Sequence, residues 1–483
     1  MRRRTFLKAG GAAVLSGLSA RALAADQPAP PDLAGDVAIL REALKLHPGL
    51  YRYNSPAAFE GRLQRFAAEF SAAPNLAGRY LALTRLTAAI RCGHSYGNFF
   101  NQRKAVAAAL FDRPTRLPLH FVWIDRAMVV VRHPGGSLQP GTRVLRLNGE
   151  DPARLRDRLL PLIRADGHND AKRVSLLEVR GDDEIETFDV FQGLLAPPTG
   201  GEHRLEVIDP SGRRQTLSLP AIGLAARQAT KTGPEVKEAE PLWQWTMRAD
   251  GIAVLTMPGW ALWNSKWDWK GWLNDRLDSL SCARGLVVDL RDNEGGADCG
   301  DLILARLIDR PWTPPLLEQR LRFRRTPAAL DRYLDTWDDS FRTLGEKATD
   351  LPNGFFLRPA GEDTLSIAPA GKRLPVRVAV LTGPVNSSAT FQFANNFRAI
   401  GGGKLYGRTT GGNRRGINGG CFFFVRLPAS GLEFDLPLVG YFPGGNQPDE
   451  GLRPDVAVMP TIADIAAGRD PVLDRAAVDL ARG

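Results

Sequence analysis

Cysteine and histidine are scarce in this sequence of 483 residues, which has four cysteines and six histidines. No two cysteines stand in the C-x-x-C spacing of common zinc and redox sites, so the cysteine pattern gives no metal site. Spacing alone pairs none of them, which leaves buried free thiols and disulfides as alternatives. The four are Cys92, Cys282, Cys299 and Cys421.

Long apolar runs and blocks of like charge are also missing from most of the chain. After the first 25 residues no apolar run is long enough to span a bilayer, so we expect a soluble body without stable membrane insertion. The formal net charge of +10 is not gathered into a basic block, which disfavours a nucleic-acid partner. With 43% hydrophobic and 24% charged residues, the composition predicts a globular protein of two to four domains.

Residues 1–24 form a predicted export signal. They combine a basic start, an apolar run of small residues and the A-x-A sequence Ala22-Leu23-Ala24. Within them, "RRTFLK" resembles the twin-arginine export signal. Cleavage before Ala25 would remove five basic residues and lower the formal charge from +10 to +5. We therefore expect twin-arginine export to the periplasm or secretion.

The first half of the remaining chain changes its pattern once. Residues 30–112 have apolar side chains at helical spacing, which predicts an N-terminal helical domain. Residues 113–222 have short strands separated by turns, and the Pro-Gly and Asn-Gly turns around "TRVLRL" resemble a PDZ domain. Such a domain would bind an extended peptide as an added strand. A generic β-rich insert is the alternative.

The second half predicts a mostly parallel α/β core. Residues 229–241 are polar and charged, contain proline, and are typical of a linker. Over 242–470, apolar runs such as "GLVVDL" and "RVAVLTG" alternate with helical segments. Strands this apolar suit a sheet that is buried on both faces.

Two of these strands end in residues that can carry chemistry. The first, 286–296, ends at Gly295-Gly296, where the backbone can turn sharply and leave N–H groups free. The second, 378–391, leads to Ser388 at the start of a helix. The N–H of Ala389 there has no partner within the helix, and the positive end of the helix dipole stabilises an oxyanion. Ser388 is thus a candidate nucleophile, with an ordinary helix N-cap as the alternative.

These segments together resemble the tail-specific, or C-terminal processing, protease family. "GLVVDLRDNEGG", "VLTGPVNSSATFQFANNF", "GRTTGGN" and "EGLRPDV" follow one another in the order and at the spacing of its motifs. The resemblance covers about 240–470, and the upstream helical region and PDZ-like insert also suit the family. It implies a ClpP/crotonase-like α/β core.

The resemblance also assigns roles to residues around the second strand end. Ser388 takes the place of the nucleophile in preference to its neighbour Ser387. The N–H of Ala389 and the turn at Gly295 and Gly296 take the place of the oxyanion hole, and the choice between the two glycines is open.

The chain departs from the branch of the family that uses a lysine base. The matching position is Asn413, whose amide cannot take a proton from serine. Arg414 and Arg415 follow it, but a guanidinium stays protonated and is no base either. A Ser–Lys dyad at the usual place is therefore excluded.

A second branch, similar to the tricorn core and retinoid-binding-protein-like members, uses serine, histidine and glutamate. "IRCGHSYGNF", residues 90–99, resembles its histidine segment, with Cys92 where an aspartate is common. This makes His94 the general base, with a structural histidine that caps the helix as the alternative. The histidines without such a context are His47, His120, His133, His168 and His203.

The carboxylate that orients the histidine is expected near the closing turn, "NQPDEGLRPDV". Glu450 is the first choice and Asp449 the alternative, whereas Asp455 fits a turn residue. We therefore interpret the chain as an exported serine peptidase that cleaves polypeptides, such as unfolded C-termini, through an acyl-enzyme without metal or organic cofactor. The alternatives are a catalytically inactive peptide-binding relative, favoured by Asn413 and Cys92, and an esterase or acyl hydrolase on the same scaffold. The sequence leaves the oligomeric state open.

Overall fold

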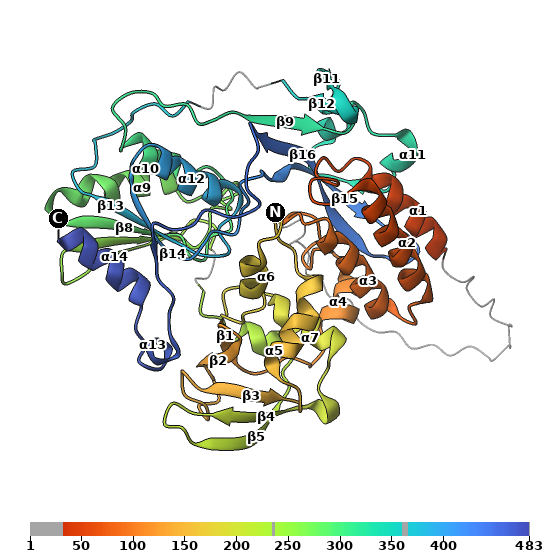
Figure 1. Ribbon diagram of the computed structural model, residues 1–483, viewed down its shortest axis with the longest axis horizontal. Coiled ribbons are helices and arrows are strands. Elements are labelled where there is room, and N and C mark those ends of the chain that lie inside the picture. Colours follow the sequence, from red (N-terminus) through yellow and green to blue (C-terminus); the bar gives the residue numbers. More distant parts are fainter. Residues whose placement is uncertain (1–31, 234–236, 360–365, 483) are drawn as a thin grey trace, which may run out of the picture.

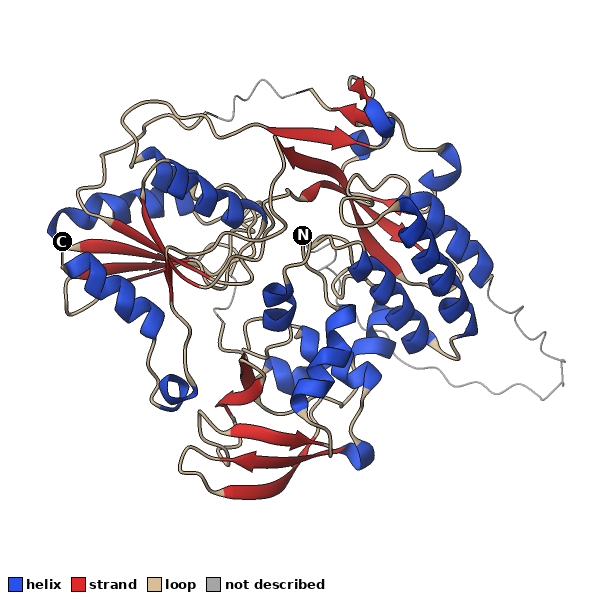
Figure 2. Ribbon diagram, in the orientation of Figure 1, coloured by secondary structure: helices blue, strands red, loops and turns tan. Residues whose placement is uncertain are grey.

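A computed structural model of the chain describes residues 32–233, 237–359 and 366–482. The predicted export signal at 1–24 lies outside the described residues. The described residues form a group of N-terminal helices, an inserted β-rich part and two further sheets with helices of their own (Figures 1 and 2).

The N-terminal helices fall in the range predicted to be helical. Asp32, Ser55 and Asn75 cap the first three by accepting a backbone N–H three residues further on. The helices are α1 (Leu33–Leu44), α2 (Pro56–Ala72), α3 (Leu76–Ala89) and α4 (Lys104–Phe111). The candidate base His94 follows the end of α3.

The inserted part contains an antiparallel sheet with the order β1-β2-β3-β4-β5. The predicted strands are present, and the PDZ-like character stays a prediction. The short helices α6, α7 and α8, which were not predicted, also belong to this part. The elements are β1 (His120–Ile124), β2 (Ala127–Arg132), β3 (Arg143–Leu147), α5 (Pro152–Leu159), α6 (Asp170–Leu176), α7 (Thr187–Leu195), β4 (Glu202–Ile208), β5 (Arg214–Pro220) and α8 (Leu224–Gln228).

The predicted parallel core is confirmed as a six-stranded sheet with the order β17-β14-β13-β8-β7-β6, in which only the β6–β7 pair is antiparallel. Its strands alternate their side chains between two apolar clusters, one under α9, α10 and α12 and the other under α14 (Figure 1). Burial of both faces explains why these strands are apolar throughout. The elements are β6 (Gln244–Met247), β7 (Ile252–Thr256), α9 (Trp269–Asp278), β8 (Gly285–Asp289), α10 (Asp301–Ala305), β13 (Val378–Thr382), α12 (Ser388–Ala399), β14 (Gly403–Gly407), β17 (Val456–Ala457), α13 (Ile462–Ala466) and α14 (Pro471–Ala481).

A second sheet lies within the segment 242–470 that the sequence analysis took as one core. Its order is β10-β15-β16-β9-β12-β11, and all of its pairs are antiparallel. Its buried side chains share one apolar cluster with the N-terminal helices and the inserted part. The elements are β9 (Leu317–Leu321), α11 (Ala328–Asp331), β10 (Leu334–Asp335), β11 (Thr349–Leu351), β12 (Phe355–Leu357), β15 (Asn418–Arg426) and β16 (Glu433–Pro443).

Within the described residues, no helix combines the length and apolarity needed to cross a membrane. The four cysteines are all free thiols, three of them buried and Cys282 exposed. Of the two alternatives that spacing left open, the structure therefore shows free thiols.

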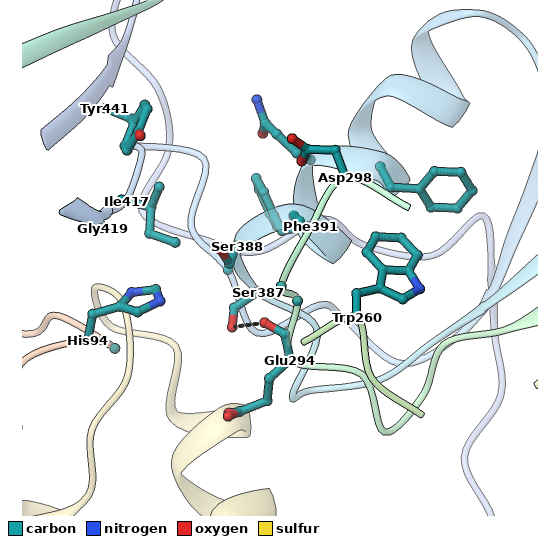
Figure 3. A pocket seen from close by; sticks show the side chains of 18 of the residues that line it. His94, Trp260, Glu294, Asp298, Ser387, Ser388, Phe391, Ile417, Gly419 and Tyr441 are labelled. Atoms are coloured by element: carbon teal, nitrogen blue, oxygen red, sulfur yellow. Dashed lines mark hydrogen bonds between the residues drawn. The ribbon is translucent and has the colours of Figure 1, made fainter. Parts of the chain in front are cut away.

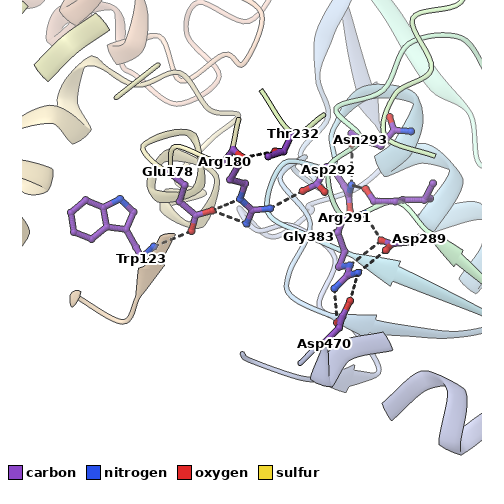
Figure 4. A network of polar contacts seen from close by, with 12 residues as sticks. Trp123, Glu178, Arg180, Thr232, Asp289, Arg291, Asp292, Asn293, Gly383 and Asp470 are labelled. Atoms are coloured by element: carbon purple, nitrogen blue, oxygen red, sulfur yellow. Dashed lines mark hydrogen bonds and ion pairs between the residues drawn. The ribbon is translucent and has the colours of Figure 1, made fainter. Parts of the chain in front are cut away.

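An ion-pair network connects the inserted part to the loop that follows β8 (Figure 4). Arg180 donates to Glu178 and to Asp292, each at 2.7 Å. Glu178 is almost fully buried and also accepts the backbone N–H of Trp123. On the other side of the loop, Arg291 pairs with two carboxylates, Asp289 and Asp470. The loop after β8 is thus held from both sides by arginines.

We predict that Arg180→Gln lowers the free energy of unfolding by about 3 kcal/mol, because it leaves the buried Glu178 carboxylate unpaired. The double variant Arg180→Gln/Glu178→Gln should recover most of this loss. Urea denaturation measures both. Arg126→Gln, which cuts the exposed pair of Arg126 with Asp157, should change little. An equal loss in the single and double variants would show that the Glu178 charge is not the cause.

Candidate active site

A cavity of about 1510 Å³ opens between the parallel sheet, the antiparallel sheet of β9, β15 and β16, the inserted part and the loop after α3. It lies beyond the carboxyl ends of β8 and β13, where open α/β sheets place their ligands. His94, Glu294, Ser387 and Ser388 all line it (Figure 3).

Ser388 is the first residue of α12 and has an unusual backbone. Its φ of +54° lies in the left-handed region, which non-glycine residues enter at a cost of about 1–3 kcal/mol. Asn386 locks the preceding loop: its side chain accepts the N–H of Gly383 at 2.7 Å and donates to the carbonyls of Leu290 and Asn293. These bonds offset the strain at Ser388.

Ser387, the neighbouring candidate, is the N-cap residue, although its side chain caps nothing. Its hydroxyl accepts from Lys172 Nζ at 2.8 Å and donates to the carbonyl of Glu294 at 3.2 Å. Ser387 is also buried, at 3% exposure. The hydroxyl of Ser388, by contrast, has no hydrogen bond among the described residues and is half-buried at the cavity wall. Of the two serines, Ser388 is the one that a ligand can reach.

Two backbone amides beside Ser388 are free to donate. The N–H groups of Ala389 and Gly296 have no partner in the described part of the chain. The N–H of Gly295, however, donates to Asn293 Oδ1 at 2.9 Å. A Cβ on Gly295 would lie 2.8 Å from the Cβ of Ser388, so only glycine permits this approach. The geometry therefore favours Gly296 over Gly295 as the second donor.

His94 projects into the same cavity from the loop after α3. Its ring lies against Phe422, with ring centroids 5.8 Å apart. Figure 3 shows the imidazole pointing across the cavity toward the loop of Ser387 and Ser388. The structure thus brings together the predicted base and the predicted nucleophile, which stand 294 positions apart in the sequence.

The surroundings of His94 keep its imidazole neutral. Burial lowers the pKa of His94 below its ordinary value of 6.5, and the charges of Lys172 and Arg164 lower it further. Asp166 and Glu294 act in the opposite direction without overcoming them. A neutral imidazole at neutral pH can accept a proton.

A charged cluster that the sequence analysis missed forms one wall of the cavity. Glu294 pairs with Arg164 at 2.9 Å and with Lys172 at 3.3 Å. Burial acts to raise the pKa of Glu294, but the two cations overcome it and hold the pKa well below its usual range. Lys172, at 1% exposure, links this cluster to Ser387. The segment "RADGHNDAKR" that supplies both cations has no apolar period and matches no motif, so the sequence offered no signal.

The predicted orienting carboxylates lie elsewhere. Glu450 pairs with Arg453 at 2.8 Å and with Arg414 at 3.7 Å. Asp449 accepts from His168 Nδ1 and, at 2.7 Å, from Asn413 Nδ2. Among the described residues neither carboxylate forms a hydrogen bond with His94, because each is bound by other partners.

Comparisons with known proteins give a match to one protein family and to several solved structures. Residues 251–458 match the model of peptidase family S41. A structure of mature CPAF complexed with lactacystin is 15% identical, with a TM-score of 0.63 over 93% of this chain and 99% of that chain. A second structure of mature CPAF, also 15% identical, has a TM-score of 0.60 over 93% and 98%. A putative peptidase from Parabacteroides merdae is 16% identical, with a TM-score of 0.46 over 93% and 96%. No curated protein sequence matches. At 15% identity the two CPAF structures show a shared fold.

The backbone of Ser388 gives a stability prediction. Ser388→Gly should have a free energy of unfolding about 1 kcal/mol higher than Ser388→Ala, because glycine adopts a positive φ without strain. The matched pair Gln392→Gly and Gln392→Ala, inside α12, should show the reverse order. Urea denaturation of the four variants tests both statements. If Ser388→Ala were as stable as Ser388→Gly, the left-handed backbone would be wrong.

Proposed function

Because residues 251–458 match the model of peptidase family S41, we propose that the chain is a serine-type peptidase that hydrolyses polypeptides with Ser388 as nucleophile and His94 as general base. One observation carries the proposal. The hydroxyl of Ser388, unlike that of Ser387, has no hydrogen bond among the described residues. It shares a cavity with the buried, neutral imidazole of His94 and with the two free backbone N–H groups.

The steps follow from these groups. Ser388 Oγ attacks the scissile carbonyl while His94 takes its proton. The N–H groups of Ala389 and Gly296 donate to the oxyanion that develops on the carbonyl oxygen. The intermediate collapses to an acyl-enzyme, and His94 gives its proton to the leaving amine. A water molecule, activated by His94, then releases the acid and restores Ser388.

The charged cluster positions the nucleophile in this scheme. Lys172 holds Ser387, and Glu294 holds Lys172, so the residue next to the nucleophile is fixed from the inserted part. This fixed geometry is what a near-attack arrangement requires.

The cavity walls suit a polypeptide rather than a compact small molecule. Aromatic side chains line it, among them Trp263, which is 55% exposed, and Phe422 and Tyr441. Aromatic surface binds the apolar side chains of an extended chain, which folded proteins keep inside. Unfolded segments and C-termini are therefore the proposed substrates.

We predict that Ser388→Ala lowers peptide turnover by a factor on the order of 10⁶ and leaves the circular dichroism spectrum unchanged. A fluorophosphonate probe should label the wild-type protein at Ser388 and leave Ser388→Ala unlabelled. Ser387→Ala distinguishes the two serines: labelling should still occur at Ser388, although more slowly, because the contact of Ser387 with Lys172 is lost. Wild-type turnover by Ser388→Ala would refute the assignment.

The same experiment separates the alternatives. A catalytically inactive peptide-binding relative would leave the probe unreacted in the wild-type protein. An esterase or acyl hydrolase would react with the probe but cleave activated esters and not unfolded protein chains. Casein and a p-nitrophenyl ester, assayed side by side, distinguish this alternative from a peptidase.

We also propose that the enzyme works outside the cytoplasm. Support comes from the basic start, the "RRTFLK" sequence and the A-x-A sequence of residues 1–24. The mature protein, recovered from cell fractions, should begin at Ala25 by N-terminal sequencing, and Arg3→Lys/Arg4→Lys should prevent processing. A cytoplasmic protein that begins at Met1 would contradict export.

A further inference from the structure

The loop of His94 is bound along its backbone by the segment 164–167. The N–H of Gly93 donates to Asp166 Oδ1 at 2.8 Å. The carbonyl of Gly93 accepts from Arg164 at 3.0 Å, and the N–H of Gly167 donates to the carbonyl of Arg91 at 3.0 Å. Asp166 therefore lies directly against the residue that precedes His94.

Besides Arg52 Nε, Tyr53 Oη and Glu294 Oε1, two further buried polar atoms in this region have no hydrogen bond among the described residues, namely His94 Nδ1 and Asp166 Oδ2. The first can carry a proton to donate, and the second can accept one. An ideal Cβ on Gly93 would lie 2.9 Å from Asp166 Oδ2, so glycine is what lets this oxygen pack beside the loop. Buried donors and acceptors are nearly always hydrogen-bonded. An unpaired donor and an unpaired acceptor in the same region therefore require an explanation.

The charge of Asp166 is also unpaired. Asp166 is 2% exposed, and no ion pair to it is formed in the described part of the chain. Arg52 lies within range of its charge, but the guanidinium donates to Asn418 and to backbone carbonyls. A buried carboxylate without a cation is costly unless its charge is used.

We propose that Asp166 is the carboxylate that positions His94, a role that rests on the proposed function. His94 Nδ1–H donates to Asp166 Oδ2, directly or through one water molecule, and this leaves Nε2 to face Ser388. When His94 takes the seryl proton, the imidazolium becomes the cation that Asp166 lacks in the resting enzyme. The interaction is therefore stronger in the transition state than in the ground state, which is the condition for it to accelerate the reaction.

This assignment accounts for the placement of Glu450 and Asp449. Both are satisfied by partners of their own, whereas Asp166 has a free oxygen beside Gly93, the residue that precedes His94. The orienting carboxylate thus comes from the inserted part rather than from the closing turn.

The test is Asp166→Asn, because the amide oxygen can still accept the N–H of Gly93 while the charge is lost. We expect kcat to fall by a factor on the order of 10³ with KM unchanged. Active-site titration with the fluorophosphonate measures the folded, reactive fraction, so that kcat can be corrected for unfolded protein. We also expect a shift in the pH profile. The charges that act on His94 are Asp166 and Glu294, which raise its pKa, and Lys172 and Arg164, which lower it. We expect the acid limb of kcat/KM below pH 6.5 in the wild type, and loss of Asp166 should move it to still lower pH.

Two further variants keep the result interpretable. Asp36→Asn is the matched control, because Asp36 is a buried carboxylate that accepts the N–H groups of Ala429 and Ser430 at a distance from the cavity. It should leave kcat and the acid limb unchanged. Asp166→Glu restores the charge and should recover part of kcat and the position of the limb.

Several results would overturn the proposal. One is wild-type kcat and an unmoved acid limb in Asp166→Asn, measured while Ser388→Ala is inactive. Another is a loss of kcat in Glu450→Gln or Asp449→Asn that Asp166→Asn does not show. An active Ser388→Ala would instead refute the proposed function, so the two failures are distinguishable.

Discussion

The ion-pair cluster of Glu294 with Arg164 and Lys172 is the contact on which the site depends. It joins the loop after β8 to the inserted part, and through Ser387 it reaches the start of α12. Because Glu294 stays ionised at low pH, the cluster keeps both of its attractions across the range in which a peptidase works. Without it, the loop of the two glycines and the turn of the two serines would lose a contact that joins both of them to the inserted part.

The same cluster shapes the chemistry as well as the architecture. Its two cations lower the pKa of His94, and its carboxylate raises it, so the imidazole is tuned by groups that also hold the loops in place. Position and protonation state are therefore coupled: a change that loosens the cluster alters both.

The sequence was informative where neighbouring strands share an edge. "GLVVDL" and "RVAVLTG" are apolar because β8 and β13 are buried on both faces, and their pairing as parallel neighbours brings Gly295 and Ser388 together at one end. The proximity of the glycine turn and the serine could be predicted for this reason. His94 was predicted by resemblance, since nothing local in the sequence shows that the loop after α3 returns to this edge.

Arg164, Asp166 and Lys172 could not be predicted, because they lie in a segment without periodicity whose position depends on the packing of the inserted part. The antiparallel sheet within 242–470 was not predicted for a similar reason. Its strands pair with partners far along the chain, and its buried side chains pack with the N-terminal helices rather than with the parallel sheet.

The arrangement of His94 and Ser388 on distant parts of the chain has a consequence for the time at which hydrolysis can begin. One group is made in the first fifth of translation and the other after about four-fifths of it, and the cluster between them needs both the inserted part and the β8 loop. A nascent chain that has not yet reached Ser388 therefore lacks one of the two groups, and under the proposed function it cannot hydrolyse a peptide bond.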